Sequence, residues 1–193
     1  RLADRFAHAL RAIVAHCRHP GAGGYTPSDF PLAPLSQPQL DALIGPGPRG
    51  QIAIDDIYPL APMQQGMLFH SLYAPDSGIY VEQLSCELRG SLSLQAFEHA
   101  WRHVAGQHPI LRTSFVWAGL DTPLQLVWRG LAVPIERHDW RGLSPADQAV
   151  QLEQYLEADR RRGFALDAAP LMRLALLRTA GDRHVCVWTH HHL

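Results

Sequence analysis

The sequence predicts an α/β fold in which helices flank a mixed β-sheet. Two observations lead to this prediction. First, 47% of the 193 residues are hydrophobic and 18% are charged, so the chain can bury a sizeable core. Second, segments with helical spacing of apolar residues alternate with short strand-like runs from residue 63 onward. Such alternation produces helices layered on a sheet.

The first 50 residues are predicted to be organised differently from the rest. Residues 2–17 place apolar side chains at helical spacing, so we expect an amphipathic helix there. Glycine and proline are dense between Pro20 and Gly50, which predicts a linker and a domain boundary near residue 50. Within the linker, Gln37–Ile44 could form a short helix with Ser36 as its N-cap. The expected units are therefore 1–50 and 51–193, with the first packing at the edge of the second or trailing from it.

Beyond the boundary, the predicted elements alternate. Ser93 is the expected N-cap of a helix whose buried face carries Leu94, Phe97, Trp101 and Val104. All five tryptophans are expected in the core or at its edge. Helices are predicted over 63–73, 94–107 and 146–162, and strands over 80–89, 111–117, 124–127, 133–138, 171–177 and 185–189.

Charge and cysteine usage exclude several classes of function. The net charge of −1 gives no sign of nucleic-acid binding, and we interpret the short run Arg160–Arg162 as a solvated helix end. No apolar stretch approaches the roughly 20 residues that span a bilayer, so no membrane partner is expected. Three cysteines without metal spacing argue against a disulfide framework, so we expect reduced thiols and a cytoplasmic protein. Because the sequence starts without Met, we expect it to be part of a longer chain.

Three consecutive histidines, His190 to His192, follow an alternating strand-like run over 183–189. A purification tag would normally follow a polar linker instead of a strand. Zinc is disfavoured, because neighbouring residues of a strand point to opposite faces and cannot easily share one ion. A catalytic role is compatible with an imidazole that titrates near neutral pH. A histidine at a strand end can also be a polar residue with purely structural contacts.

Several motifs resemble those of condensation domains from nonribosomal peptide synthetases. Asp55–His70 (DDIYPLAPMQQGMLFH) is similar to the opening signature of that family. The segment 107–115 (QHPILRTSF) resembles the family's second signature, R-H-x-x-L-R-T-x-F, except that Gln107 replaces the first Arg. Residues 164–173 resemble the segment before the active site, and His191-His192 resembles the start of the active-site motif H-H-x-x-x-D-G.

This resemblance implies a chloramphenicol-acetyltransferase-like architecture of two lobes with a tunnel between them. The chain would be the first lobe, and the Asp and Gly of the motif, with the C-terminal lobe, would lie beyond Leu193. In the family the second histidine of the motif is the functional one, which selects His192 and leaves His191 a supporting role. The motif could instead begin at His190. We prefer His192 because relatives with three histidines continue with aliphatic residues, as Leu193 does.

The resemblance also implies the reaction and the partners. A donor thioester and an aminoacyl acceptor, each on the phosphopantetheine arm of a carrier domain, would be joined by an amide bond. Upstream and downstream peptidyl carrier domains are therefore the expected partners, with no directly bound cofactor and no metal. The chain alone is expected to be inactive. Whether His192 acts as a base or as a polar stabiliser stays open, since either fits an imidazole beside the reacting centre.

The first 45 residues resemble something else. Phe6, Leu10 and especially Tyr25–Leu32 (YTPSDFPL) are similar to the tail and exit linker of an epimerization domain. A preceding epimerization domain implies a condensation domain of the subtype that accepts D-configured donors.

Two rival functions stay open. One is a non-catalytic scaffold or a docking lobe for carrier proteins, and the other is a coenzyme A-dependent acyltransferase of the same fold. Arg112 and Arg173 could bind a phosphate or carboxylate. An internal hydrogen-bond network is the favoured interpretation for both, because a guanidinium offers five donors in a fixed fork.

Overall fold

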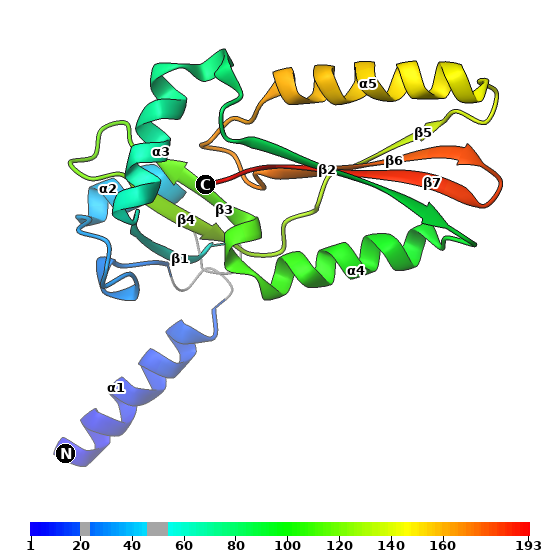
Figure 1. Ribbon diagram of the computed structural model, residues 1–193. Coiled ribbons are helices and arrows are strands. Elements are labelled where there is room, and N and C mark those ends of the chain that lie inside the picture. The colour runs from blue at the N-terminus through cyan, green and yellow to red at the C-terminus, as the bar shows by residue number, and fades with distance from the viewer. Residues whose placement is uncertain (20–23, 46–53) are drawn as a thin grey trace.

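A computed structural model of the chain describes residues 1–19, 24–45 and 54–193 and contains two β-sheets (Figure 1). The smaller sheet is antiparallel and has the order β1 (Ile54–Pro59), β4 (Leu124–Trp128), β3 (Thr113–Val116). The larger sheet has the order β2 (Val81–Arg89), β7 (Arg183–His191), β6 (Met172–Ala180), β5 (Ile135–Asp139). Its β5–β6 pair is parallel and its other pairs are antiparallel, so the predicted α/β fold with a mixed sheet is confirmed.

Strand β1 was not predicted, and its sequence explains why. A strand with one buried face alternates apolar and polar residues, whereas here the two isoleucines are three residues apart. The pairing register with β4 shifts between Ile54 and Asp56, which marks a bulge or irregularity in the strand. The extra residue lets Ile54 and Ile57 both point inward, where they are 1% and 0% exposed.

Helices cover both faces of the larger sheet (Figure 1). On one face, α5 (Pro145–Arg162) packs Leu152, Tyr155 and Leu156 against buried strand residues that include Val187. On the other face, α4 (Leu94–Gln107) packs Phe97 and Trp101 against a cluster that contains Met172, Leu174, Leu176 and Cys186. The central strand β6 is therefore buried on both sides over its first six residues, which accounts for its long apolar run.

The predicted bounds of the elements need several corrections. The N-cap at Ser93 is confirmed, because its Oγ accepts a hydrogen bond from the Ala96 N–H. Leu94 and Val104 were expected on the buried face of α4 but are 37% and 38% exposed. The strand expected from residue 111 begins at Thr113, because Pro109–Arg112 form a 3₁₀ turn. Helix α3 spans Pro62–Tyr73, and all five tryptophans lie in or against a buried cluster.

The N-terminal segment divides into two parts. Helix α1 (Leu2–Cys17) forms as predicted, but none of its residues is buried, so its apolar stripe stays exposed. In contrast, Phe30 and Leu40 pack in one cluster with Ile54 and residues of β4. Leu40 belongs to α2 (Gln37–Ile44), whose predicted cap is confirmed by a hydrogen bond from the Ser36 N–H to the Gln39 side chain (2.9 Å). The expected boundary near residue 50 lies outside the described residues.

Candidate active site

The end of β7 separates the three histidines. Across the sheet, His190 pairs with Glu82 and His191 with Val81 of the edge strand β2. The chain leaves the sheet at His192, whose backbone N–H still donates to the Tyr80 carbonyl (2.8 Å). Because successive residues of a strand point to opposite faces, His190 lies on the face of Trp188 and His191 on the face of Thr189. The site therefore presents imidazoles on both sides of the sheet.

His191 occupies the more enclosed position. Its Nδ1 accepts a hydrogen bond from the Leu193 N–H (3.1 Å), and its Nε2 lies 3.4 Å from the Ser71 hydroxyl. Its ring also lies edge-on to Tyr80, with 6.0 Å between the ring centroids. Burial, with smaller contributions from His192 and His190, lowers the pKa of His191 to about 4. His191 is thus a neutral, packed imidazole at physiological pH.

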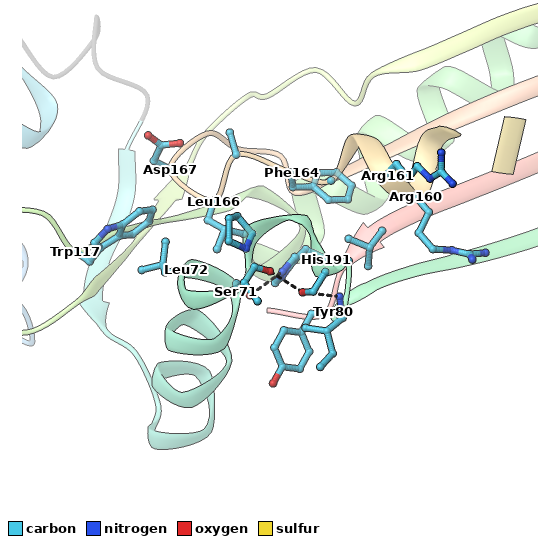
Figure 2. A pocket seen from close by; sticks show the side chains of 18 residues that line it. Ser71, Leu72, Tyr80, Trp117, Arg160, Arg161, Phe164, Leu166, Asp167 and His191 are labelled. Carbon is cyan, nitrogen blue, oxygen red and sulfur yellow. Dashed lines mark hydrogen bonds between the residues drawn. The ribbon is translucent and has the colours of Figure 1, made fainter. Parts of the chain in front are cut away.

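A cavity of about 250 Å³ lies on the inner side of His191 (Figure 2). Its wall is built from α3, from the turn before β2 and from the segment after α5. Figure 2 shows Ser71 and His191 turned toward each other, with Phe164 and Leu166 beyond them. Arg160, Arg161 and Asp167 also line the cavity, but the guanidinium groups of the two arginines are hydrogen-bonded to Gln83 and Glu157. Of the three histidines, His191 lines this cavity, whereas His190 and His192 do not.

His192 points the other way. Its side chain is 56% exposed, and its Nδ1 lies 2.9 Å from a carboxylate oxygen of Glu82. The Nε2 of His190 lies 3.8 Å from the other oxygen of the same carboxylate, and the His190 ring packs on Trp188 at 4.5 Å between centroids. A second cavity, of about 210 Å³, is lined by all three histidines together with apolar residues such as Leu111 and Met172. An accessible imidazole at an apolar cavity is suited to proton transfer.

A buried polar network supports the strand end from behind. The Arg173 guanidinium pairs with the Asp159 carboxylate, and these two side chains are 7% and 5% exposed. Asp159 also accepts hydrogen bonds from Thr189 and from Gln83 (2.9 Å), so it connects α5 to β7 and β2. Burial alone would raise the pKa of Asp159, but these donors together lower it. The guanidinium further lies over the Phe164 ring at 4.3 Å.

The structure places Arg112 in an internal network, as the favoured interpretation expected. Its guanidinium contacts the Asp55 carboxylate and donates to the Trp128 carbonyl (2.5 Å). Asp55 also accepts a hydrogen bond from Arg129 (2.6 Å). Desolvation opposes ionisation of Asp55, but the two guanidinium groups lower its pKa overall. These contacts join β1 to the start of β3 and the end of β4. Arg173 likewise has its partner in Asp159.

Sequence reasoning identified the histidines but missed the residues around them. Glu82, Ser71 and Asp159 were not singled out. For Asp159 a signal was present, because it shares the inward face of its helix with Leu152, Tyr155 and Leu156. An acidic residue on an apolar helix face requires a buried partner. For Glu82 no such signal exists, since its contact depends on the pairing of two distant strands.

Neither a metal cluster nor a membrane span is present in the described part of the chain. Within residues 1–19, 24–45 and 54–193, no cluster of three or more His, Cys, Asp or Glu side chains could hold a metal ion. The helices of the same ranges include none that is long and apolar enough to cross a bilayer.

Residues 54–193 match the family model described as "Condensation domain". The whole chain is 49% identical to a segment of one subunit of linear gramicidin synthase from Brevibacillus parabrevis, covering 4% of that subunit. It is 46% identical to a segment of another subunit of the same synthase, covering 2% of it. Bacitracin synthase 3 from Bacillus licheniformis is 35% identical over 99% of this chain and 3% of its own length. The chain thus spans a small fraction of each of these relatives.

Solved structures share the fold of 70% or more of the chain. A four-domain nonribosomal peptide synthetase, solved with AMP and glycine, superposes with a TM-score of 0.64 at 22% identity, over 72% of this chain and 10% of that one. The starter condensation domain of rhizomide synthetase superposes with a TM-score of 0.63 at 24% identity, over 72% of this chain and 34% of that one. Both likenesses support the α/β architecture described above.

Proposed function

Because this chain belongs to the condensation domain family, we propose that it forms the first lobe of a peptide-bond-forming domain in a nonribosomal peptide synthetase. The observation that carries the proposal is the accessible imidazole of His192 at the end of a buried strand, beside an apolar cavity of about 210 Å³. The relatives reported above are synthases of gramicidin and bacitracin, and their names support the same reaction class.

The proposed reaction joins two carrier-bound substrates. The amine of the acceptor attacks the thioester carbonyl of the donor, and a C–N bond forms while the C–S bond breaks. The amine loses one proton, and the departing thiolate gains one, so the products are an amide and a free carrier thiol. An imidazole at the reacting nitrogen can carry this proton, which typically contributes a factor of about 100 to 10,000 in rate.

The surroundings of the histidines support different roles for them. His192 is accessible and is therefore the proposed catalytic residue. His191 has its Nδ1 engaged by the Leu193 N–H and its pKa lowered to about 4 by burial, which suits a packing role. His190 packs on Trp188 and is also placed among the structural residues. This assignment corresponds to a motif that begins at His191.

The partners follow from the proposed reaction. Upstream and downstream carrier domains would present the donor and the acceptor on phosphopantetheine arms, and a C-terminal lobe would close the tunnel. We place the protein in the cytoplasm, and we assign residues 1–50 to the tail and linker of a preceding epimerization domain. The donor would then end in a D-configured residue. The chain without its second lobe would not form peptide bonds, because a catalytic geometry needs support from both sides.

The test is a condensation assay with the intact synthetase and loaded donor and acceptor carriers. His192→Ala should lower the rate of product formation by about 100- to 10,000-fold. His190→Ala, on the same strand end and the same carboxylate, is the matched control and should have a milder effect. The reversed order would contradict the assignment of His192. Unchanged turnover in both variants would favour a scaffold, and turnover of an acyl-coenzyme A donor without a carrier would favour the other acyltransferase.

A further inference from the structure

Glu82 and His192 face each other at the edge of the larger sheet. The Nδ1 of His192 lies 2.9 Å from the Glu82 carboxylate, which is hydrogen-bonding distance. The backbone fixes this approach from both sides. Glu82 is paired in register with His190, and the His192 N–H donates to the Tyr80 carbonyl, two residues before Glu82 on the same chain.

A carboxylate can only accept a hydrogen bond, so the short contact requires a proton on Nδ1 of His192. In a neutral imidazole, a proton on Nδ1 leaves the lone pair on Nε2. That nitrogen is then free to accept a proton from an amine. The opposite tautomer would aim a lone pair at the carboxylate and leave an N–H on Nε2, which could donate to an oxyanion but could not act as a base.

We propose that Glu82 is a positioning residue that holds the Nδ1–H tautomer of His192 and directs its Nε2 lone pair toward the acceptor amine. This inference rests on the proposed function and deepens it, because it selects the base role for His192. The proton moves from the amine nitrogen to Nε2 as the C–N bond forms, and from Nε2 to the thiolate as the C–S bond breaks. Glu82 exchanges no proton in either step and touches neither substrate.

His190 offers a second partner for the same carboxylate. Its Nε2 lies 3.8 Å from Glu82, beyond hydrogen-bonding distance, and its ring is engaged by Trp188. Of the two imidazoles, only that of His192 lies within hydrogen-bonding distance of Glu82. An exposed pair of this kind adds little to folding stability. We therefore expect Glu82 to affect turnover through His192 and not through the stability of the fold.

The experiment is a double-mutant cycle in the intact synthetase, with carrier-loaded substrates and steady-state product detection. Glu82→Ala should lower kcat by about 10- to 100-fold with KM unchanged, because it removes a group that orients the imidazole. This is less than the ~10,000-fold loss for a buried orienting carboxylate, because Glu82 is 55% exposed. In a His192→Ala background, Glu82→Ala should cost nothing further, since residues that act as one unit are not additive. Glu82→Gln, which keeps an acceptor oxygen, should retain more activity than Glu82→Ala.

Glu87 provides the matched control. It is a carboxylate on the same edge strand, but its partners are Arg89 and Arg183. Glu87→Ala should leave kcat unchanged. The positioning role is wrong if Glu82→Ala lowers kcat in the His192→Ala background by the same factor as in the wild type. It is also wrong if Glu82→Ala changes kcat no more than Glu87→Ala does. If His192→Ala itself turns over at the wild-type rate, the proposed function fails, and that result is distinct from failure of the inference.

Discussion

Arg173 and Asp159 form an ion pair in which both side chains are more than nine-tenths buried, directly behind the strand that ends in the histidines. The guanidinium also donates to the Gly163 carbonyl (2.7 Å), and the carboxylate accepts from Thr189 and Gln83. Removing two charges from water is unfavourable in free energy. Their mutual attraction and these hydrogen bonds offset that desolvation penalty. The pair holds α5 against β6 and β7.

Breaking this pair from one side should destabilise the domain strongly. Arg173→Met leaves the Asp159 carboxylate buried without its cation, so we expect a loss of about 3–5 kcal/mol in the free energy of unfolding. Urea denaturation of the purified condensation domain measures it. Asp139→Asn, which breaks the exposed pair with Arg141, is the control and should leave the midpoint nearly unchanged. A small effect of Arg173→Met would show that the buried pair contributes no net stability.

His191 predicts a dependence of stability on pH. Its pKa is lowered to about 4 in the folded state, whereas an unfolded histidine titrates near 6.5. Between these values the unfolded chain binds more protons, so the free energy of unfolding should fall as the pH is lowered from about 6.5 to about 4. The contribution of His191 is fully present above pH 6.5. His191→Gln should therefore flatten the pH dependence of the unfolding midpoint in this window.

Ser71→Ala is the control for that measurement. It removes the hydroxyl that lies 3.4 Å from Nε2 but leaves the imidazole to titrate. The unfolding midpoint of Ser71→Ala should therefore depend on pH with the same slope as that of the wild type. Equal slopes for the wild type and His191→Gln would mean that other groups dominate this window.

The sequence predicted most helices and strands because their periodicity is strong. The apolar positions of α4 and α5 repeat at helical spacing, and β6 and β7 are long enough to be recognised as strands. Strand β1 was missed because a register shift between Ile54 and Asp56 breaks the alternation that identifies a strand. The second sheet was missed with it, since β1 is one of its three strands.

The site was predictable only in part. The histidines were recognised because their consecutive arrangement is visible in the sequence. The pairing of Asp159 with Arg173 could have been inferred, because Arg173 shares a strand face with Ala175 and Leu177, and Asp159 shares a helix face that packs on those two residues. The contact of Glu82 with His192 could not have been inferred from the sequence, because it depends on which strand lies beside β7.

The exposed apolar stripe of α1 predicts that this helix does not contribute to the stability of residues 54–193. None of its residues is buried, so Phe6→Asp should change the unfolding free energy of residues 54–193 by no more than about 0.5 kcal/mol. If the helix belongs to a preceding domain, the same change should destabilise that domain. Hydrogen exchange of the intact protein separates the two effects by peptide. Leu40→Asp, at a fully buried site of the same N-terminal segment, should instead increase exchange in β1 and β4. Increased exchange there in Phe6→Asp would contradict the assignment of α1.

The handedness of the donor is the last expectation, and it rests on the resemblance of residues 1–45 to an epimerization tail. An upstream epimerization domain supplies both configurations at its carrier, so a following condensation domain sets the product only by favouring one donor in the transition state. We therefore expect faster use of a donor that ends in a D residue. Each tenfold preference requires about 1.4 kcal/mol, which contacts in the cavity beside His192 can provide.

The measurement presents the intact synthetase, without an active epimerase, with carrier-bound donors of each configuration. Because Glu82 acts on the proton and not on the donor, Glu82→Ala should slow both donors by the same factor and serves as the control. Faster use of the L-configured donor would overturn both the donor preference and the epimerization assignment of residues 1–50.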